Sequence, residues 1–168
     1  AFKPYSKFGD GNSQVYIVPL AGGDPVVFEL DHPLWYVHFV NTFQPNASSI
    51  VADITEFPNN PFFEPGANIS AQLNKAVRDA DATRAVVVRY TFHLAGALAG
   101  NVTRTPISSP ERFTDFPTIN DKVNGLPYCI FYGVEWRHDN KTKGAMAIVK
   151  TNICTGESVH WYKPNHYP

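Results

Sequence analysis

The sequence predicts a mainly β fold with one inserted helix, and three observations lead to this class. Short apolar segments rich in Val, Ile, Phe and Tyr recur along the whole chain of 168 residues. Fourteen Pro and eleven Gly are scattered between them, a spacing that suits short strands joined by turns. With 43% hydrophobic and 14% aromatic residues, the chain can bury a sizeable core, which excludes general disorder.

Four strands are expected in the first third of the chain. Each is a short apolar segment bounded by Gly, Pro or Asn. The first two flank a Gly-Gly turn, and the next two are joined by the Gln-Pro-Asn-Ala segment at residues 44–47. The four strands are residues 15–19, 26–30, 35–43 and 50–57.

The one helical pattern follows a loop. Residues 58–67 are rich in Pro, Asn and Gly and therefore predict a loop. In residues 69–80, Leu73, Ala76 and Val77 share one face of a helix, with charged residues opposite.

The second half of the chain returns to strands. Residues 84–94 alternate cleanly, so that one side carries Val86, Val88, Tyr90, Phe92 and Leu94. Further strands are expected at residues 101–107, 128–137, 145–152 and 158–163.

A faint repeat suggests how these strands assemble. A strand, a turn ending in Gly and a further strand beginning near Val occur around Gly100 and again around Gly156, 56 residues apart. This spacing is close to the period of about 50 residues of a kelch-type propeller blade. Each such blade is a small antiparallel sheet that must stack on its neighbours.

Charge and hydropathy exclude two classes of partner. The 14 Lys and Arg against 15 Asp and Glu leave no excess of basic charge for a nucleic-acid backbone. No apolar run reaches the roughly 20 residues that a membrane-spanning helix needs. The chain begins Ala1-Phe2-Lys3 with neither Met nor a signal peptide, so we expect a processed or truncated chain.

Four Asn-x-Ser/Thr sequons bear on the location of the protein. They are Asn46, Asn68, Asn101 and Asn140, and chance would give roughly one or two. One interpretation is coincidence in an Asn-rich sequence. The other is a secreted, glycosylated chain, which also agrees with the missing Met.

The two cysteines offer a related choice. If residues 128–137 and 145–152 pair as a hairpin, Cys129 lies opposite the end of the second strand, close to Cys154. A disulfide is then geometrically feasible and would suit a secreted protein. The alternative is two separate thiols, one of them buried as a small hydrophobic side chain.

Candidate chemistry centres on His38 and Asp115. The six His form no HExxH motif, and the chain has no CxxC pair and no Gly-rich phosphate loop. His38 lies within a strand among bulky apolar residues, where it is either a core His bonded to backbone or a metal ligand oriented by a carboxylate. Asp115 lies between aromatic residues and needs a partner. It either caps a turn or orients such a His.

Several motifs in order resemble the carotenoid cleavage oxygenases, the family of carotenoid dioxygenases and the retinoid isomerase of the retinal pigment epithelium. Residues 35–43, Trp-Tyr-Val-His-Phe-Val-Asn-Thr-Phe, resemble the family's iron-ligand strand. The resemblance covers most of the chain, from about residue 15 to residue 168. The other matching segments are residues 50–53, the helical residues 69–80, the Arg-containing strand 84–94, the Asp-Phe-Pro-Thr-Ile-Asn block within 113–120, and Gly-Leu-Pro-Tyr-Cys-Ile-Phe-Tyr-Gly at 125–133.

The resemblance implies a seven-bladed β-propeller with an axial Fe(II) held by four His and oriented by three Glu. Open positions on the iron bind O₂, and an aromatic tunnel positions a polyene. His38 matches one iron ligand, and Asp115 matches one orienting carboxylate, with Asp in place of the family's usual Glu. Family chains are much longer. Residues 1–168 are therefore expected to form two to three blades of a partial propeller, completed by segments that supply the other three His.

Three functions remain open on the sequence. The first is a segment of a non-haem Fe(II) dioxygenase that cleaves a carotenoid or apocarotenoid double bond. The second is a secreted, non-catalytic carotenoid-binding protein on the same fold, favoured by Asp115, the sequons and the cysteines. The third is a small β domain without a ligand, which is disfavoured because a partial propeller would expose unpaired strand edges.

Overall fold

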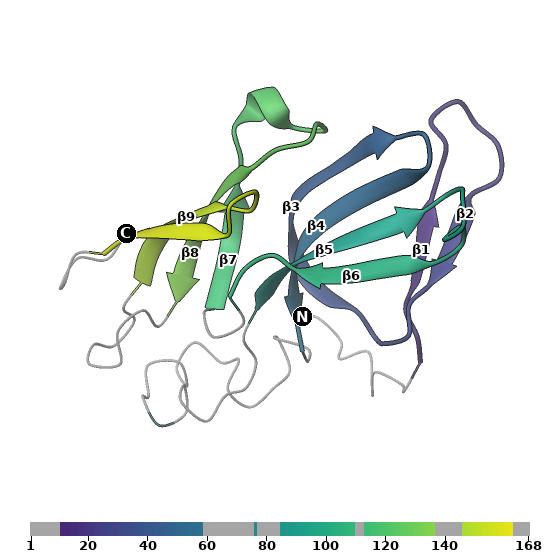
Figure 1. Cartoon of the computed structure of the whole chain (residues 1–168). Helices are drawn as coiled ribbons and strands as arrows, with labels where there is room; N and C mark the ends of the chain where they lie inside the picture. Colours follow the sequence, from purple (N-terminus) through teal and green to yellow (C-terminus); the bar gives the residue numbers. More distant parts are fainter. Residues whose placement is uncertain (1–10, 59–75, 77–84, 110–112, 137–145, 163–168) are drawn as a thin grey trace.

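The computed structural model describes residues 11–58, 76, 85–109, 113–136 and 146–162. These residues form three antiparallel sheets (Figure 1). The strands are β1 (Gln14–Ile17), β2 (Val26–Glu29), β3 (Trp35–Asn46), β4 (Ser49–Phe57), β5 (Val86–His93), β6 (Val102–Pro106), β7 (Phe113–Thr118), β8 (Ile130–Trp136), β9 (Met146–Asn152) and β10 (Glu157–Trp161).

Two of the sheets share one topology. Strands β3-β4-β5-β6 form one four-stranded sheet in chain order, and β7 to β10 form the other in the same way. Each is a simple meander, the arrangement of a propeller blade. Gly100 and Gly156 lie in corresponding turns, between the third and fourth strand of each sheet, at φ of 83° and 77°. The faint sequence repeat therefore marks two structurally equivalent turns, and the predicted mainly β propeller segment is confirmed.

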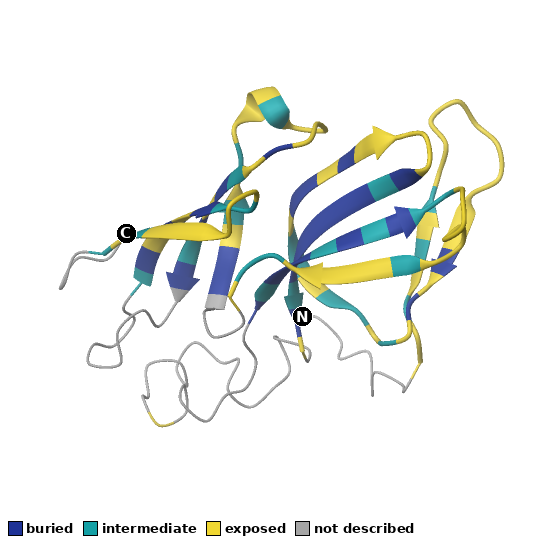
Figure 2. Ribbon diagram, in the orientation of Figure 1, coloured by how far each residue is buried: buried dark blue, intermediate teal, exposed yellow. Residues whose placement is uncertain are grey.

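The sheet β3–β6 is covered on both faces. One face packs against the β1–β2 hairpin through a core of Phe28, Leu30, Ala52, Ile54, Val88, Tyr90 and Phe92. The other face meets the second sheet through a core of Val40, Phe43, Val51, Val87, Tyr128 and Phe131. Strand β5 supplies both cores in alternation, as its pattern predicts, and the sheet is dark blue through its centre in Figure 2.

Within the described residues, the sheet β7–β10 has one covered face and one exposed face. Phe131, Ala147 and Val149 lie on its inner face and are at most 2% exposed. The residues that alternate with these along each strand point to the outer face, as the strand register shows. Four large apolar side chains of this outer face are exposed: Tyr132 at 42%, Ile148 at 41%, Val159 at 67% and Trp161 at 58%.

The disulfide between Cys129 and Cys154 is present, with 5.2 Å between the two Cα atoms. As expected, β8 and β9 pair antiparallel, with Ile130 opposite Asn152. The backbone N–H of Ile153 donates to the carbonyl of Cys129, which holds the start of β8 beside the turn that carries Cys154.

The sequence did not predict strand β7, because Asp115 and Pro117 interrupt its apolar pattern. The predicted helix at residues 69–80 lies outside the described residues, apart from Ala76. Among the described residues, no helix has the length and apolar character that a membrane crossing needs.

Candidate functional site

His38 lies on an irregular part of β3. Tyr36 pairs with Glu56 and Phe39 with Ile54, so two residues of β3 oppose Thr55 alone. The Thr55 hydroxyl accepts from the backbone N–H of His38 at 3.0 Å and donates to its carbonyl at 3.3 Å. A buried hydroxyl thus replaces the missing ladder bonds of a β-bulge.

The bulged register breaks the two-residue alternation that a regular strand would have at residues 36–41. A second shift follows between Phe39 and Asn41. As a result, Val40 and Asn41 are both buried, at 7% and 3% exposure, although they are neighbours in sequence. Each extra residue reverses the faces of the residues that follow, which a period of two cannot predict.

The imidazole of His38 is bonded directly to Asp115. The distance from Nδ1 to the Asp115 Oδ1 is 2.7 Å, so the Asp side chain reaches the ring although it is one methylene shorter than the family's usual Glu. A carboxylate accepts, so Nδ1 carries the proton and Nε2 keeps its lone pair in the neutral ring. Nε2 has no hydrogen-bond partner among the described residues, and the His38 side chain is 35% exposed while that of Asp115 is 8% exposed.

Phe116 covers this pair from an unusual backbone conformation. Its φ is +48°, in the left-handed region that non-Gly residues seldom adopt, and its ring centroid lies 4.9 Å from that of His38. Asp115 pairs with Val134 and Thr118 with Tyr132, so β7 is also bulged at this point. Two bulged strands therefore meet at one His–carboxylate pair, a local strain of the kind that functional sites retain.

Gly133 lets β7 and β8 approach closely behind Asp115. A Cβ on this residue would lie 2.8 Å from Thr114 Cγ2 and 3.1 Å from the carbonyl oxygen of Asp115. Because one of these atoms is backbone, the strands would have to move apart to accept a side chain. Gly133 thus helps to set the position of Asp115.

Asn41 fixes the loop that follows β7. Its side-chain Nδ2 donates to the carbonyls of Val123 and Leu126, at 3.2 and 3.0 Å. Its Oδ1 accepts from the N–H of Gly125 at 3.0 Å and of Thr42 at 2.9 Å. Both N–H donors and both acceptor positions of this buried amide are therefore occupied. The amide holds the loop after β7 against the strand of His38.

A buried ionic group joins the two sheets nearby. Asp53 is fully buried and accepts two bonds from Arg89 at 2.8 Å each and one from the Tyr128 hydroxyl at 2.6 Å. Burial, followed by the charge of Asp53, raises the pKa of Tyr128, which keeps the hydroxyl protonated as a donor. Asp53 thereby links β4 and β5 to the segment that leads into β8.

One exposed aromatic ring lies beside His38. Phe116 is 52% exposed and provides apolar surface next to the imidazole. Tyr36 and Phe39 are 47% and 53% exposed, with ring centroids 5.1 Å apart in an edge-to-face arrangement. They pair with Glu56 and Ile54, on the hairpin-covered face of the β3–β6 sheet.

The residues fit a metal only as part of a larger ligand set. His38 has an oriented ring and an accessible Nε2, as a metal-ligating His requires. No group of three or more His, Cys, Asp or Glu that could hold a metal is found within the part of the chain that the structure describes. Fe(II) would therefore need imidazoles from beyond these residues.

Two of the four sequons lie in neighbouring turns. Asn46 ends β3 and Asn101 precedes β6, and both are exposed. The N–H of Leu94 donates to the carbonyl of Ser48 at 2.8 Å, which joins the two turns. Asn68 and Asn140 lie outside the described residues.

Sequence reasoning overlooked the residues that hold the His38–Asp115 pair in place. Phe116, Asn41 and Gly133 were quoted only as parts of motifs, without a role. A Phe-Pro directly after an isolated Asp was the available signal for an irregular β7, because Pro cannot donate to a sheet ladder. The contacts of Asn41 span more than 80 residues of sequence, and no local pattern reports them.

Comparison with protein families gives one match. The model of the retinal pigment epithelial membrane protein family (RPE65) matches residues 4–168. No curated protein sequence matches the chain.

Solved structures agree with the family match. Cobalt-substituted Synechocystis ACO aligns with a TM-score of 0.68 at 19% identity, over 91% of this chain and 29% of that one. A mutant of Synechocystis apocarotenoid oxygenase (ACO) aligns at 0.69 with the same identity of 19%. An ACO/RPE65 chimera aligns at 0.70 and 17% identity, over 95% of this chain and 34% of that one. At these identities the likeness shows the fold, and the chain spans about a third of the length of these structures.

Proposed function

The chain belongs to the retinal pigment epithelial membrane protein family, and on this premise we propose that it forms part of a non-haem Fe(II) dioxygenase acting on a carotenoid or apocarotenoid. The observation that carries the proposal is the His38–Asp115 pair, in which one ring nitrogen is held at 2.7 Å and the other is accessible. A solved structure named as an apocarotenoid oxygenase shares the fold and supports the substrate class.

Asp115 has a positioning role in this proposal. By accepting the Nδ1 proton it fixes both the tautomer and the direction of the His38 ring, so that Nε2 presents a lone pair. Fe(II), when bound, would supply the O₂ activation that scission of a double bond requires. Overall, one O₂ is consumed for each double bond and both carbons leave as carbonyls, so no external reductant is needed.

Phe116 would contact the polyene beside His38. Its half-exposed ring packs on the imidazole, with 4.9 Å between the two ring centroids. A conjugated chain offers apolar surface and few polar groups, so ring stacking and desolvation would provide most of its binding free energy.

Metal content tests the proposal. We expect natively purified protein, with its complementary segments, to contain iron, and His38→Ala to lose most of it. His93→Ala is the matched control, because His93 bonds Thr103 and pairs with Ser49, six residues along β4 from the Thr55 that bonds His38. Asp115→Ala should lower iron affinity by about 10–100-fold, and Asp115→Glu should retain it. Iron content unchanged in His38→Ala would refute the iron site.

A carrier protein is the second candidate. It is favoured by Asp115, which replaces the family's usual Glu, together with the disulfide between Cys129 and Cys154. In this case a carotenoid occupies the aromatic surface and no bond is cleaved. Visible absorption of the purified protein without iron supports the carrier, and iron without colour supports the enzyme. In the carrier, His38→Ala leaves pigment binding largely intact.

We also propose that a complementary propeller segment covers the outer face of the β7–β10 sheet. Tyr132, Ile148, Val159 and Trp161 form an exposed apolar surface there, with Lys150 in the central row between Tyr132 and Val159. Two copies of this face would bring their Lys150 side chains together, which disfavours self-association. A neighbouring sheet with a carboxylate opposite Lys150 suits it better.

Copurification tests this partner. We expect the chain either to copurify with complementary polypeptide or to be continuous with it, and Lys150→Glu to weaken the association. Lys122→Glu, a charge reversal on the exposed helical turn after β7, is the control. A monodisperse 168-residue monomer that unfolds cooperatively would contradict the proposal.

We also propose that the protein is secreted and N-glycosylated. Asn46 and Asn101 are exposed in turns, where a glycan extends into water. Mass spectrometry of natively sourced protein should find glycan on at least one of Asn46, Asn68, Asn101 and Asn140. If all four side chains were bare, secretion would lose its main support.

A further inference from the structure

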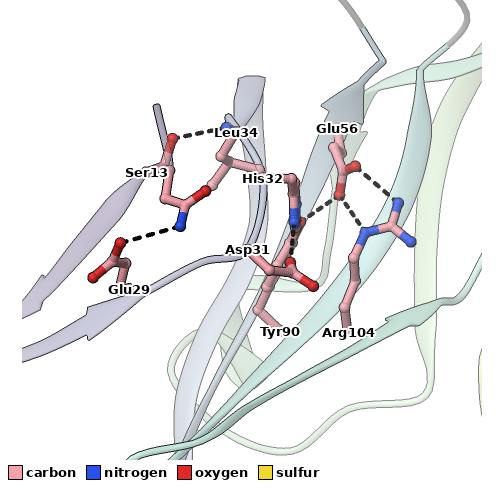
Figure 3. A network of polar contacts seen from close by, with 9 residues as sticks. Ser13, Glu29, Asp31, His32, Leu34, Glu56, Tyr90 and Arg104 are labelled. Atoms are coloured by element: carbon pink, nitrogen blue, oxygen red, sulfur yellow. Dashed lines mark hydrogen bonds and ion pairs between the residues drawn. The ribbon is translucent and has the colours of Figure 1, made fainter. Parts of the chain in front are cut away.

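A second polar network lies on the opposite side of the β3–β6 sheet from the His38 site. His32 follows β2, and its ring stacks near Tyr90 of β5, with centroids 6.2 Å apart (Figure 3). Nδ1 lies 2.6 Å from the Asp31 carboxylate, and Nε2 lies 3.0 Å from the Tyr90 hydroxyl. Both ring nitrogens of His32 therefore face an oxygen atom.

The proton positions in this network can be counted. Tyr90 has one hydroxyl proton, which it donates to the Glu56 carboxylate at 2.6 Å. The Tyr90 oxygen must then accept from His32 Nε2, so this nitrogen carries a proton. The Asp31 carboxylate can only accept, so Nδ1 carries one as well. All contacts are satisfied together only by an imidazolium.

We infer that His32 is a doubly protonated clamp that fastens the β1–β2 hairpin to the β3–β6 sheet and loosens when its ring loses one proton. The inference is independent of the proposed iron chemistry, because His32 and its partners touch neither His38 nor Asp115.

Further charged and titratable groups complete the network around His32. Asp31 lies on the same segment, with its side chain 98% exposed, and the bond to His32 followed by the His32 charge lowers its pKa. From β4, Glu56 faces the Tyr90 hydroxyl, and Arg104 of β6 binds Glu56 through two bonds of 3.0 and 2.8 Å. Burial and then Glu56 raise the pKa of Tyr90, so its proton stays on the oxygen.

The clamp lies where the hairpin is joined to the sheet. The His32 carbonyl accepts from the N–H of Ser13, and the Ser13 hydroxyl accepts from the N–H of Leu34. Phe28 and Leu30 supply the hydrophobic part of this attachment, which does not depend on pH. When His32 loses one proton, one of its two ring bonds is lost, and the hairpin opens more often as a local unit.

Nitrogen NMR of the ring tests the proton count in the intact protein. We expect His32 to show two protonated ring nitrogens under the conditions in which the β1 and β2 amides are protected. His93 is an internal control, because among the described residues only its Nε2 has a hydrogen-bond neighbour, the Thr103 hydroxyl at 2.9 Å. A His32 ring with one protonated nitrogen under conditions in which the hairpin is fully protected would overturn the inference.

Hydrogen exchange of the hairpin tests the consequence. Protection of the β1 and β2 amides, corrected for intrinsic exchange, should fall about tenfold as rising pH removes one proton from the His32 ring, while β4 and β5 keep theirs. Asp31→Ala and Tyr90→Phe each remove one acceptor, so the ring then needs only one proton and the pH dependence should disappear. Asp31 is exposed, so that variant remains interpretable if Tyr90→Phe fails to fold. An unchanged pH dependence in Asp31→Ala would refute the clamp.

Discussion

The two four-stranded sheets have the same topology but different surroundings. The β3–β6 sheet has a neighbour on each face and contains fully buried residues such as Val87 and Val88. The β7–β10 sheet has a covered inner face and an outer face on which Val159 and Trp161 are more than half exposed. An identical strand order therefore does not give equal burial. Burial depends on which blades lie on either side.

The two sheets also differ in what holds them together. The β3–β6 sheet contains the buried Asp53–Arg89 pair, which also contacts Tyr128. The β7–β10 sheet contains the Cys129–Cys154 disulfide and a His160–Glu135 pair at 2.7 Å, whose imidazole is charged only when protonated. A sheet with one open face buries less apolar surface, and a covalent link that restricts its unfolded chain offsets part of this deficit. The following changes test this contrast, each by urea unfolding of the intact protein.

Asp53→Ala should have the largest effect, a loss of about 3–5 kcal/mol, because it leaves Arg89 and Tyr128 without their buried acceptor. Asp24→Ala, in an exposed turn, should change stability by less than about 0.5 kcal/mol. Equal effects of the two substitutions would show that the buried pair does not stabilise the first sheet.

Replacing both cysteines by Ala should cost about 3 kcal/mol, since the disulfide closes a loop with a sequence separation of 25 residues. Hydrogen exchange should place the loss in β8–β10 and leave β3–β6 protected. A uniform loss over both sheets would argue against a separate stabilising device for the second one.

Gly133→Ala should cost about 2 kcal/mol, because the new Cβ would lie 3.1 Å from the Asp115 carbonyl and force β7 from β8. It should also lower metal or pigment binding, since Asp115 moves relative to His38. Gly100→Ala is the control, because it adds backbone strain without a steric clash. The φ of Gly100 is +83°, and no atom lies within 4 Å of the added Cβ. That control should lose about 1 kcal/mol without any effect on binding.

The smallest expected difference compares one side chain in two settings. Val88→Ala should cost about 2 kcal/mol, because Val88 is 0% exposed. Val159 is 67% exposed in this chain, so Val159→Ala should cost less than Val88→Ala but well above about 0.5 kcal/mol if a neighbouring sheet covers the outer face of the intact protein. A cost below about 0.5 kcal/mol would show that this face stays open.

The sequence by itself determined the β class, most strands, the hairpin that brings Cys129 to Cys154, and the choice of His38 and Asp115. These depend on periodicity, turn residues and local order, which a linear pattern records. Tertiary structure decided the rest. The two bulges that reverse the faces around His38, the Asn41 contacts across more than 80 residues, and the left-handed Phe116 all arise where β3 meets β7. Tyr90, one of the two proton acceptors of His32, likewise lies 58 residues away in the sequence. Such contacts form only once the sheets pack, because their free energy comes from partners distant in sequence, and no local pattern encodes the distance between them.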